Sequence, residues 1–383
     1  MKLVLTILLV LSIGVSCAVT DYACMFLAIN PSNISRALGY GNIGVVDVWH
    51  NNPLTSYSNP AIASLHEGIS YGYTHENWNT GSHMYYDGGL INIGYKGIGV
   101  ILPAPNKSSN YGINLDYESY PQTIKQKDIL RSYRSKESAA VYGLSFNTTE
   151  FMKRTEEYIP LFGMLDLAVG AERVYIKSNL NYDMGPGYPE DYYDITSEAA
   201  CLNLGLISRF KYFPDENIKL EGVYGLSLFN AFNEKINYLD DDRKDTIYRF
   251  TNNGLALSAS VLSENLLKNR VNQDLIFFDN ILSTRLFVSL EDDYTYREDK
   301  LSYGVEVGFL DTFFIRRGHY RDRDGSVVGD TEGYGISLHY KNLFEYSYNS
   351  SSIPTGLSNN EKSSDQTFMI NLVELYNLTL ANK

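Results

Sequence analysis

Apolar and polar residues alternate with a period of two along most of the chain after about residue 69. In the stretch 301–309, Leu301 and Tyr303 fall on one face with further apolar residues, while Ser302 and Glu306 fall on the other. A period of two indicates a β-strand, because successive side chains of a strand point to opposite faces of its sheet. The pattern therefore predicts an all-β fold in which each strand has one apolar face.

The length of these segments and their second face favour a transmembrane barrel over a soluble sandwich. Several run for about 9–12 residues, the length that crosses a bilayer at a tilt of about 45°. Their second face is mostly Gly, Ser, Asn and charged residues, as expected for a lumen. The same alternation recurs at 140–146, 202–212, 220–228, 255–261, 334–340, 344–348 and 368–372. The charged residues expected to face the lumen are Arg209, Lys211, Glu306, Lys341 and Glu345.

Composition and loop pattern agree with a membrane barrel. The chain has 32 Tyr and 30 Gly in 383 residues, which suits aromatic girdles and strongly twisted strands. Long polar loops are expected at 179–198 and 237–246, and they alternate with short turns. About 22 residues per strand and connection predicts an antiparallel barrel of about 14 strands. The stretch 264–280 fits either a short amphipathic helix or an irregular loop.

The first 18 residues have the features of a secretory signal peptide. Lys2 precedes an apolar run from Leu3 to Val15, and small residues around Ala18 favour cleavage before Val19. Lipid attachment at Cys17 is the alternative reading of the same segment. The chain is therefore expected to be exported to the outer membrane.

Charge and cysteine content exclude several other classes. The net charge of −13 argues against nucleic acid as a partner. Only Cys24 and Cys201 remain after cleavage, so the chain is not a disulfide scaffold. No later stretch of about 18 apolar residues predicts a transmembrane helix.

The N-terminal region contains a formal G-x-G-x-x-G at Gly39, Gly41 and Gly44. A dinucleotide site needs a strand before these glycines and a helix after them. Here a polar run precedes them, and the turn-forming pairs Asn52-Pro53 and Asn59-Pro60 follow. The glycines are therefore expected to serve the backbone, through positive φ and close approach, and not a phosphate.

The run from Phe26 to Ala61 resembles the opening of the PorV/PorQ type of bacterial outer-membrane protein, a branch of the FadL-like barrels. The resemblance also covers Arg316-Arg317-Gly318 in a later strand pair. It implies a luminal hatch in the segment 19–66, before a barrel formed by 67–383. The hatch motif consists of Arg36, Gly39, Gly41, Gly44, Asn59, Pro60 and Ala61.

No enzymatic, metal or cofactor chemistry is expected. The aspartates Asp322, Asp324 and Asp330 lack the ligand spacing of a calcium loop and fit an Asp-Gly hairpin turn. The Asp240–Asp242 run is read as a solvated loop. None of the six histidines accompanies a G-x-S-x-G nucleophile signature, and His339 is expected to be a hydrogen-bonded luminal residue.

Two classes of function compete. The PorV resemblance implies a secretion or surface-assembly component that binds other proteins, and the polar second faces of the strands favour this reading. The FadL resemblance implies a passive transporter, in which a hydrophobic small molecule passes the hatch and leaves through the wall. Apolar residues on the lumen face near the hatch would favour the transporter. Membrane lipid is a partner in both.

Overall fold

The computed structural model describes residues 22–39, 43–79, 82–108, 110–119, 132–152, 165–183, 192–237, 244–263, 278–293, 299–321, 328–340, 343–354, 361–372 and 374–376. The signal-peptide region, with Cys17, therefore lies outside the described residues, as do Gly41, Asp240–Asp242, Asp322, Asp324 and Lys341. Most of 264–280 also lies outside them.

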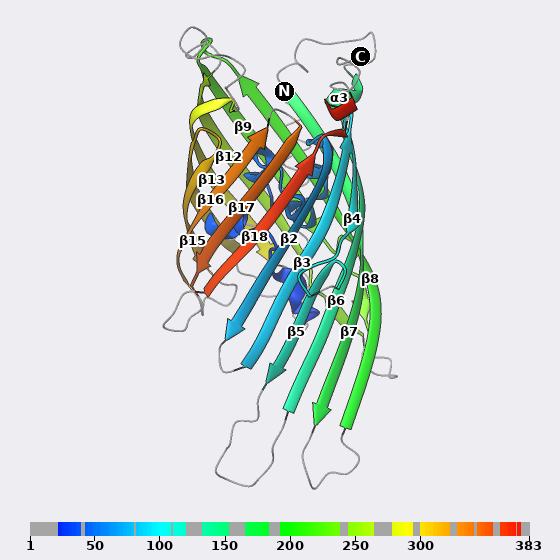
Figure 1. The fold of residues 1–383 in the computed structure, drawn as a ribbon. Coiled ribbons are helices and arrows are strands. Elements are labelled where there is room, and N and C mark those ends of the chain that lie inside the picture. The colour runs from blue at the N-terminus through cyan, green and yellow to red at the C-terminus, as the bar shows by residue number, and fades with distance from the viewer. Residues whose placement is uncertain are drawn as a thin grey trace.

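The chain folds into a closed antiparallel β-barrel, which confirms the predicted fold class (Figure 1). A 15-stranded sheet closes because β2 pairs with both β18 and β3. Because β4 and β5 lie end to end between β3 and β6, the barrel has 14 strand positions. The strands are β2 Gly68–Asn79, β3 Ser82–Tyr95, β4 Ile98–Pro103, β5 Ile113–Ser119, β6 Ser132–Asn147, β7 Leu165–Asp183, β8 Tyr192–Tyr212, β9 Ile218–Phe229, β12 Phe250–Leu262, β13 Asn280–Asp293, β14 Asp299–Phe309, β15 Phe313–Arg321, β16 Val328–Tyr340, β17 Phe344–Ile353 and β18 Glu361–Ile370.

The alternation seen in the sequence becomes an outer and an inner face. On β6, Tyr142, Leu144 and Phe146 are 46%, 53% and 50% exposed. On β14, Leu301 and Tyr303 are exposed, whereas Glu306 is fully buried. An exposed apolar belt around a closed barrel is the surface that faces lipid in transmembrane barrels. No helix in the described part of the chain is long and apolar enough to cross a membrane.

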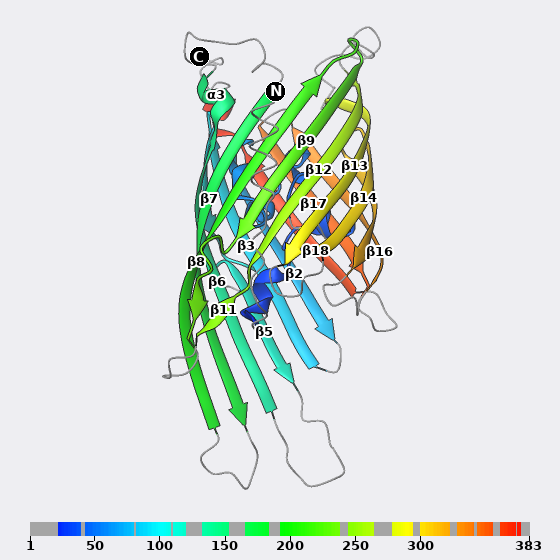
Figure 2. The same ribbon diagram turned by 180° about the vertical axis from the view of Figure 1, so that it is seen from behind.

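The two ends of the barrel differ. At the end where β2 begins, which we call the turn end, short connections include 96–97, 213–217 and 310–312. At the opposite end, the loop end, β5 to β8 extend beyond the other strands (Figures 1 and 2). In outer-membrane barrels, short turns face the periplasm and long loops face outward.

The long loop expected at 179–198 is partly wrong, because β7 continues to Asp183 and β8 begins at Tyr192. The ladder there includes Lys177 opposite Glu198. These strand ends lie beyond the apolar belt, so their outward side chains are polar and the hydrophobic alternation disappears while the backbone pairing continues.

The loop expected at 237–246 contains part of a second, three-stranded sheet. In it, β11 (Asp245–Ile247) pairs with β1 (Tyr22–Ala23) and with β10 (Lys235–Ile236). Strands of two or three residues are too short to produce a recognisable alternation. A short helix, α3 (Thr148–Met152), follows β6 at the turn end.

Candidate functional site

The lumen is occupied by residues 24–39 and 43–65, which we call the luminal segment (Figures 1 and 2). It consists of η1 Met25–Ala28, α2 Asn33–Ala37, η2 Asp47–Trp49, η3 Pro53–Tyr57 and η4 Pro60–Ser64. The Asn-Pro pairs begin the last two of these helices. Asn52 and Asn59 are the N-caps, and the side chain of each accepts a hydrogen bond from the backbone N–H two residues later. Proline occupies the first position of each helix.

Arg36 is fully buried between the luminal segment and the wall. Its Nη1 lies 2.5 Å from Oε2 of Glu76 on β2 and donates to the hydroxyl of Ser363 on β18 at 3.0 Å. Its Nε donates to the Asn30 carbonyl at 2.5 Å. The guanidinium therefore joins two wall strands to the backbone of the luminal segment.

Gly39 lies where the luminal segment touches the wall at its backbone. Its φ is +94°, and a Cβ there would lie 2.4 Å from the carbonyl oxygen of His319 on β15. Facing it, a Cβ on Gly318 would lie 2.4 Å from the Gly39 nitrogen. Gly44 also has a positive φ, of +71°. In the described residues on either side, α2 precedes Gly39 and a 3-10 helix follows Gly44, whereas a dinucleotide site needs a strand before its glycines.

The Asn59-Pro60-Ala61 turn rests against two wall glycines. The Asn59 amide donates to the carbonyls of Leu206 on β8 and Leu226 on β9, both at 3.3 Å. A Cβ on Gly170 would lie 2.5 Å from the Pro60 carbonyl carbon, and one on Gly205 would lie 2.1 Å from Oδ1 of Asn59. Because Gly170 and Gly205 have no side chains, the turn can pack directly against the wall.

A buried charged cluster joins the luminal segment to β13, β14 and β15. Glu306 accepts from Nε of Arg316 at 2.6 Å and from Nη1 of Arg285. Nε2 of His50 lies 3.0 Å from Oε2 of Glu306. Burial lowers the pKa of His50 to about 4, so this histidine is neutral at pH 7 and the two arginines carry the positive charge facing Glu306.

A second polar contact lies beside this cluster, because the register places Glu221 of β9 in the same cross-strand row as Arg285 and Glu306. The indole N–H of Trp49 donates to Glu221 on β9 at 2.7 Å. Glu221 is also paired with Arg209 at 2.6 Å and with Lys219 at 3.3 Å. The ring of Trp49 lies 5.2 Å from the guanidinium carbon of Arg285, within cation–π range. Trp49 thus connects the two charged clusters.

Two buried aspartates fix the middle of the luminal segment. Asp365 on β18 accepts from the Asn33 backbone at 2.7 Å and from the Asn349 amide at 2.9 Å. Asp47 accepts from the hydroxyls of Ser32 and Ser35 at 2.9 and 2.8 Å. Burial raises the pKa of Asp47 to about 7, against the opposing effect of these hydrogen bonds.

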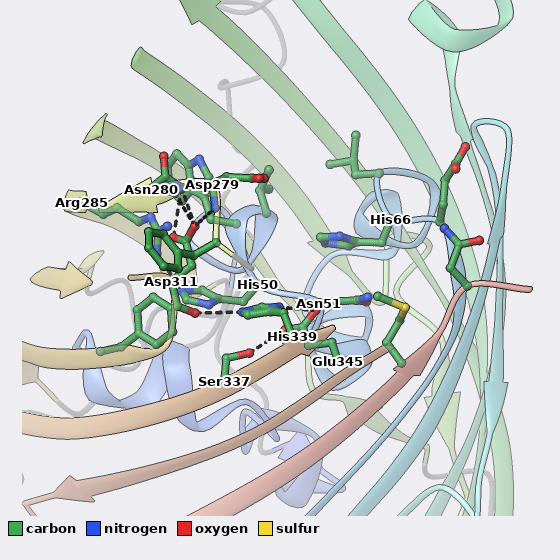
Figure 3. A pocket seen from close by; sticks show the side chains of 18 of the residues that line it. His50, Asn51, His66, Asp279, Asn280, Arg285, Asp311, Ser337, His339 and Glu345 are labelled. Atoms are coloured by element: carbon green, nitrogen blue, oxygen red, sulfur yellow. Dashed lines mark hydrogen bonds and ion pairs between the residues drawn. The ribbon is translucent and has the colours of Figure 1, made fainter. Parts of the chain in front are cut away.

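A cavity of about 500 Å³ lies between the luminal segment and the turn end (Figure 3). His50, His66 and Arg285 border it together with wall residues that include Asp311 and His339. His339 Nε2 lies 2.9 Å from the Asp311 carbonyl oxygen, and the carboxylate of Asp311 accepts from the backbone and amide of Asn280. Burial lowers the pKa of His66 to about 4. The cavity lining is mainly polar, so it suits water and hydrogen-bonding groups.

On the loop side, the luminal segment instead contacts an apolar wall. Side chains of β3 to β9 that point inward surround Phe26, Leu27 and Tyr57, and most are completely buried. The wall residues of this apolar sector are Leu90, Ile101, Ile113, Ala139, Val141, Val174, Ile176, Cys201 and Phe229. Ile236, Ile247 and Tyr248, which follow β9 and precede β12, complete the sector at the loop end.

The expectation of a largely polar lumen is therefore correct for only one side of the barrel. Ser302, Glu306 and Ser337 face inward on β14 and β16, but β3 to β7 place apolar side chains there. Strands such as 85–95 carry apolar residues on both faces, and alternation alone cannot assign their inner face. Among the predicted luminal charges, Arg209, Glu306 and Glu345 border the lumen, and Lys211 pairs with Asp166 at 3.1 Å.

Sequence reasoning missed Arg285 and did not predict that Arg316 and His50 contact Glu306. The signal was present in the 282–290 stretch, where leucines and valines alternate with Ser283 and Arg285. Asp330, considered for calcium, pairs instead with Arg317 at 2.7 Å on the outer face, next to the hairpin formed by β15 and β16.

Comparisons with known proteins concern the fold alone. No protein-family model and no curated protein matches the chain. A Pseudomonas aeruginosa FadL homologue is 12% identical with a TM-score of 0.37, over 88% of this chain and 96% of that one. The Pseudomonas putida toluene transporter TodX is 10% identical with a TM-score of 0.38, over 92% and 98%. The transport unit of the Escherichia coli autotransporter AIDA-I is 10% identical with a TM-score of 0.38, over 79% and 88%. Function must therefore be argued from the residues of this chain.

Proposed function

We propose that the chain is an outer-membrane barrel that admits hydrophobic small molecules passively, with the luminal segment as its gate. The observation that carries this proposal is the apolar sector on the loop side of the lumen. Its wall residues surround Phe26, Leu27 and Tyr57 instead of lining a water-filled pore. A ligand that replaces these side chains would find an apolar surface of the same shape.

The attachment of the luminal segment is compatible with gating. Its polar contacts to the wall include Arg36–Glu76, His50–Glu306, Trp49–Glu221 and Asn33–Asp365. Hydrogen bonds from Tyr86 to the Ile29 carbonyl and from Asn92 to Ser56 join it to β3. The apolar contacts between these points are not directional. Movement of η1 and η3 away from β3 to β7 would break the two hydrogen bonds to β3 and open the apolar sector, while the anchors at β2, β9, β14 and β18 remain.

The test is uptake of a hydrophobic fluorescent probe by cells that carry the protein in their outer membrane. Val141→Thr with Val174→Thr makes the apolar sector polar at nearly constant volume, and we expect several-fold slower uptake. Val223→Thr is the matched control, because Val223 is equally buried but belongs to a different cluster, around Ile43 and Val45. Equal uptake by all three proteins would exclude this route.

A secretion or surface-assembly role, as the PorV/PorQ type implies, is the second candidate. The extended ends of β5 to β8 favour it, because their outward residues are charged and lie beyond the apolar belt, with Arg134, Lys177 and Glu198 among them. Purification from detergent separates the two functions. A stoichiometric protein partner supports secretion, whereas a bound apolar molecule supports transport. Both proposals place the barrel in the outer membrane and require neither a cofactor nor catalysis.

A further inference from the structure

An open groove on the outer wall is lined by Ala140, Tyr142, Arg173 and Tyr175. Arg173 is exposed on the outward face of β7. In the sheet register it stands between Tyr142 on β6 and Leu202 on β8. An arginine on this face requires an explanation, because a charged side chain against the hydrocarbon core costs about 2–4 kcal/mol at the midplane but only about 0–1 near the interface.

The neighbours of Arg173 place it at the loop-side border of the apolar belt. Toward the turn end, the outward residues of β7 are Val169 and Ala171. Toward the loop end they are Lys177 and Asn179. Tyrosines gather at the same level, as they do in the aromatic girdles that mark the headgroup region of a bilayer.

The groove has the shape and chemistry to hold a phosphate. The rings of Tyr142 and Tyr175 meet edge to face with centroids 5.9 Å apart. Tyr175 stands between two small residues, Ala140 and Ala200, which leave space beside it. Within the described part of the chain, no side chain pairs with the Arg173 guanidinium. Its planar fork of N–H donors is therefore available to bind a phosphate group through two hydrogen bonds.

We propose that Arg173, Tyr142 and Tyr175 form a site for the phosphate of an anionic lipid in the leaflet on the loop side. The acyl chains of that lipid lie against Leu144, Val169 and Leu204, which continue the outer face toward the turn end. The site is on the lipid side of the wall and is independent of the luminal segment. It would hold the barrel at a fixed depth and favour lipids with exposed phosphates.

Native mass spectrometry of the detergent-purified barrel, incubated with bisphosphorylated lipid A or its dephosphorylated form, tests the site. We expect the unaltered protein to retain the bisphosphorylated form, and Arg173→Gln to weaken retention about tenfold, since a hydrogen-bonded charge pair is lost. Lys177→Gln is the matched control, because Lys177 lies four residues away on the same face of β7 but pairs with Glu198 at 3.6 Å. It should have little effect.

Equal weakening by Arg173→Gln and Lys177→Gln would overturn the proposal, because it would indicate a diffuse effect of charge. Equal retention of the phosphorylated and dephosphorylated lipids by the unaltered protein would also overturn it. The second comparison uses only the unaltered protein. It therefore tests the phosphate site even if Arg173→Gln fails to fold into a barrel. Arg173→Lys, which keeps the charge but loses the fork, should give an intermediate result.

Discussion

Arg36 of the luminal segment and Glu76 of β2 form an ion pair 2.5 Å long in which both side chains are completely buried. The pair connects the segment to the wall 40 residues along the chain. Buried charges are tolerated only when each is compensated, so neither residue can be changed alone without cost.

Replacement of Arg36 with Met should lower the free energy of unfolding by about 3–5 kcal/mol, because Glu76 would remain buried without its partner. Equilibrium urea unfolding in lipid vesicles measures this change. The double variant Arg36→Met with Glu76→Gln should be more stable than the single variant. If the double variant were the less stable of the two, the pair would not be the reason for the loss.

Alanine at Gly39 should destabilise the barrel by at least about 1–2 kcal/mol, since the left-handed backbone alone costs this much for a residue with a Cβ. The added carbon would also meet the His319 carbonyl. Gly222→Ala is the control, because the nearest atom to its added carbon is a Leu257 methyl at 3.7 Å. Similar unfolding free energies for the two variants would contradict the close contact inferred at Gly39.

Glu306→Gln should destabilise the attachment of the luminal segment, because Arg285 and Arg316 would face each other without a carboxylate between them. The expected loss is about 3–5 kcal/mol. Limited proteolysis of the segment, combined with urea unfolding, measures it. Asp330→Asn breaks an exposed pair on the outer face and should leave both measurements unchanged.

The stability of the barrel should depend on pH through the luminal segment. The pKa of Asp47 rises from 3.8 to about 7 on folding, so its contribution is present at low pH and is lost as pH rises from about 4 to about 7. The pKa of His50 falls from 6.5 to about 4, so its contribution is present above pH 6.5 and is lost as pH falls toward 4.

Asp47→Asn removes the first of these two opposing effects. The variant should therefore show a steeper loss of unfolding free energy between pH 6.5 and 4 than the unaltered protein. Urea unfolding at a series of pH values is the measurement. Parallel curves for the two proteins would show that Asp47 keeps an ordinary pKa in the folded state.

The barrel was predictable because alternation repeats in many strands and each repeat carries the same information. The residues at 301–309 indicate both a strand and its lipid-facing side, and the structure agrees. The apolar sector was not predictable in this way, since Leu90, Ile91 and Ile93 put apolar side chains on both faces of β3. The inner face there depends on what fills the lumen.

The wall residues that contact the luminal segment could not be predicted from local sequence patterns either. His50 and Glu306 are 256 residues apart, and Asn33 and Asp365 are 332 apart. The hatch motif includes Arg36 but does not predict that its ion-pair partner is Glu76. That partner is determined by how the barrel closes and by the strand register. The close contacts of Gly39 with Gly318 and of Asn59 with Gly205 illustrate the same limit.

Locking the luminal segment to the wall tests its role as the gate most directly. The Cβ of Pro31 lies 3.4 Å from the position of a Cβ on Gly88 of β3, close to the separation found in disulfides. Pro31→Cys with Gly88→Cys, with Cys24 and Cys201 changed to alanine, should therefore form a bridge. Gly329→Cys with Pro354→Cys, at 3.1 Å, joins two parts of the wall and is the control.

Uptake of the hydrophobic fluorescent probe is then measured before and after reduction. We expect the oxidised Pro31–Gly88 lock to abolish uptake, reduction to restore it, and the control bridge to have no effect. Undiminished uptake through the fully oxidised lock would contradict gating by the luminal segment.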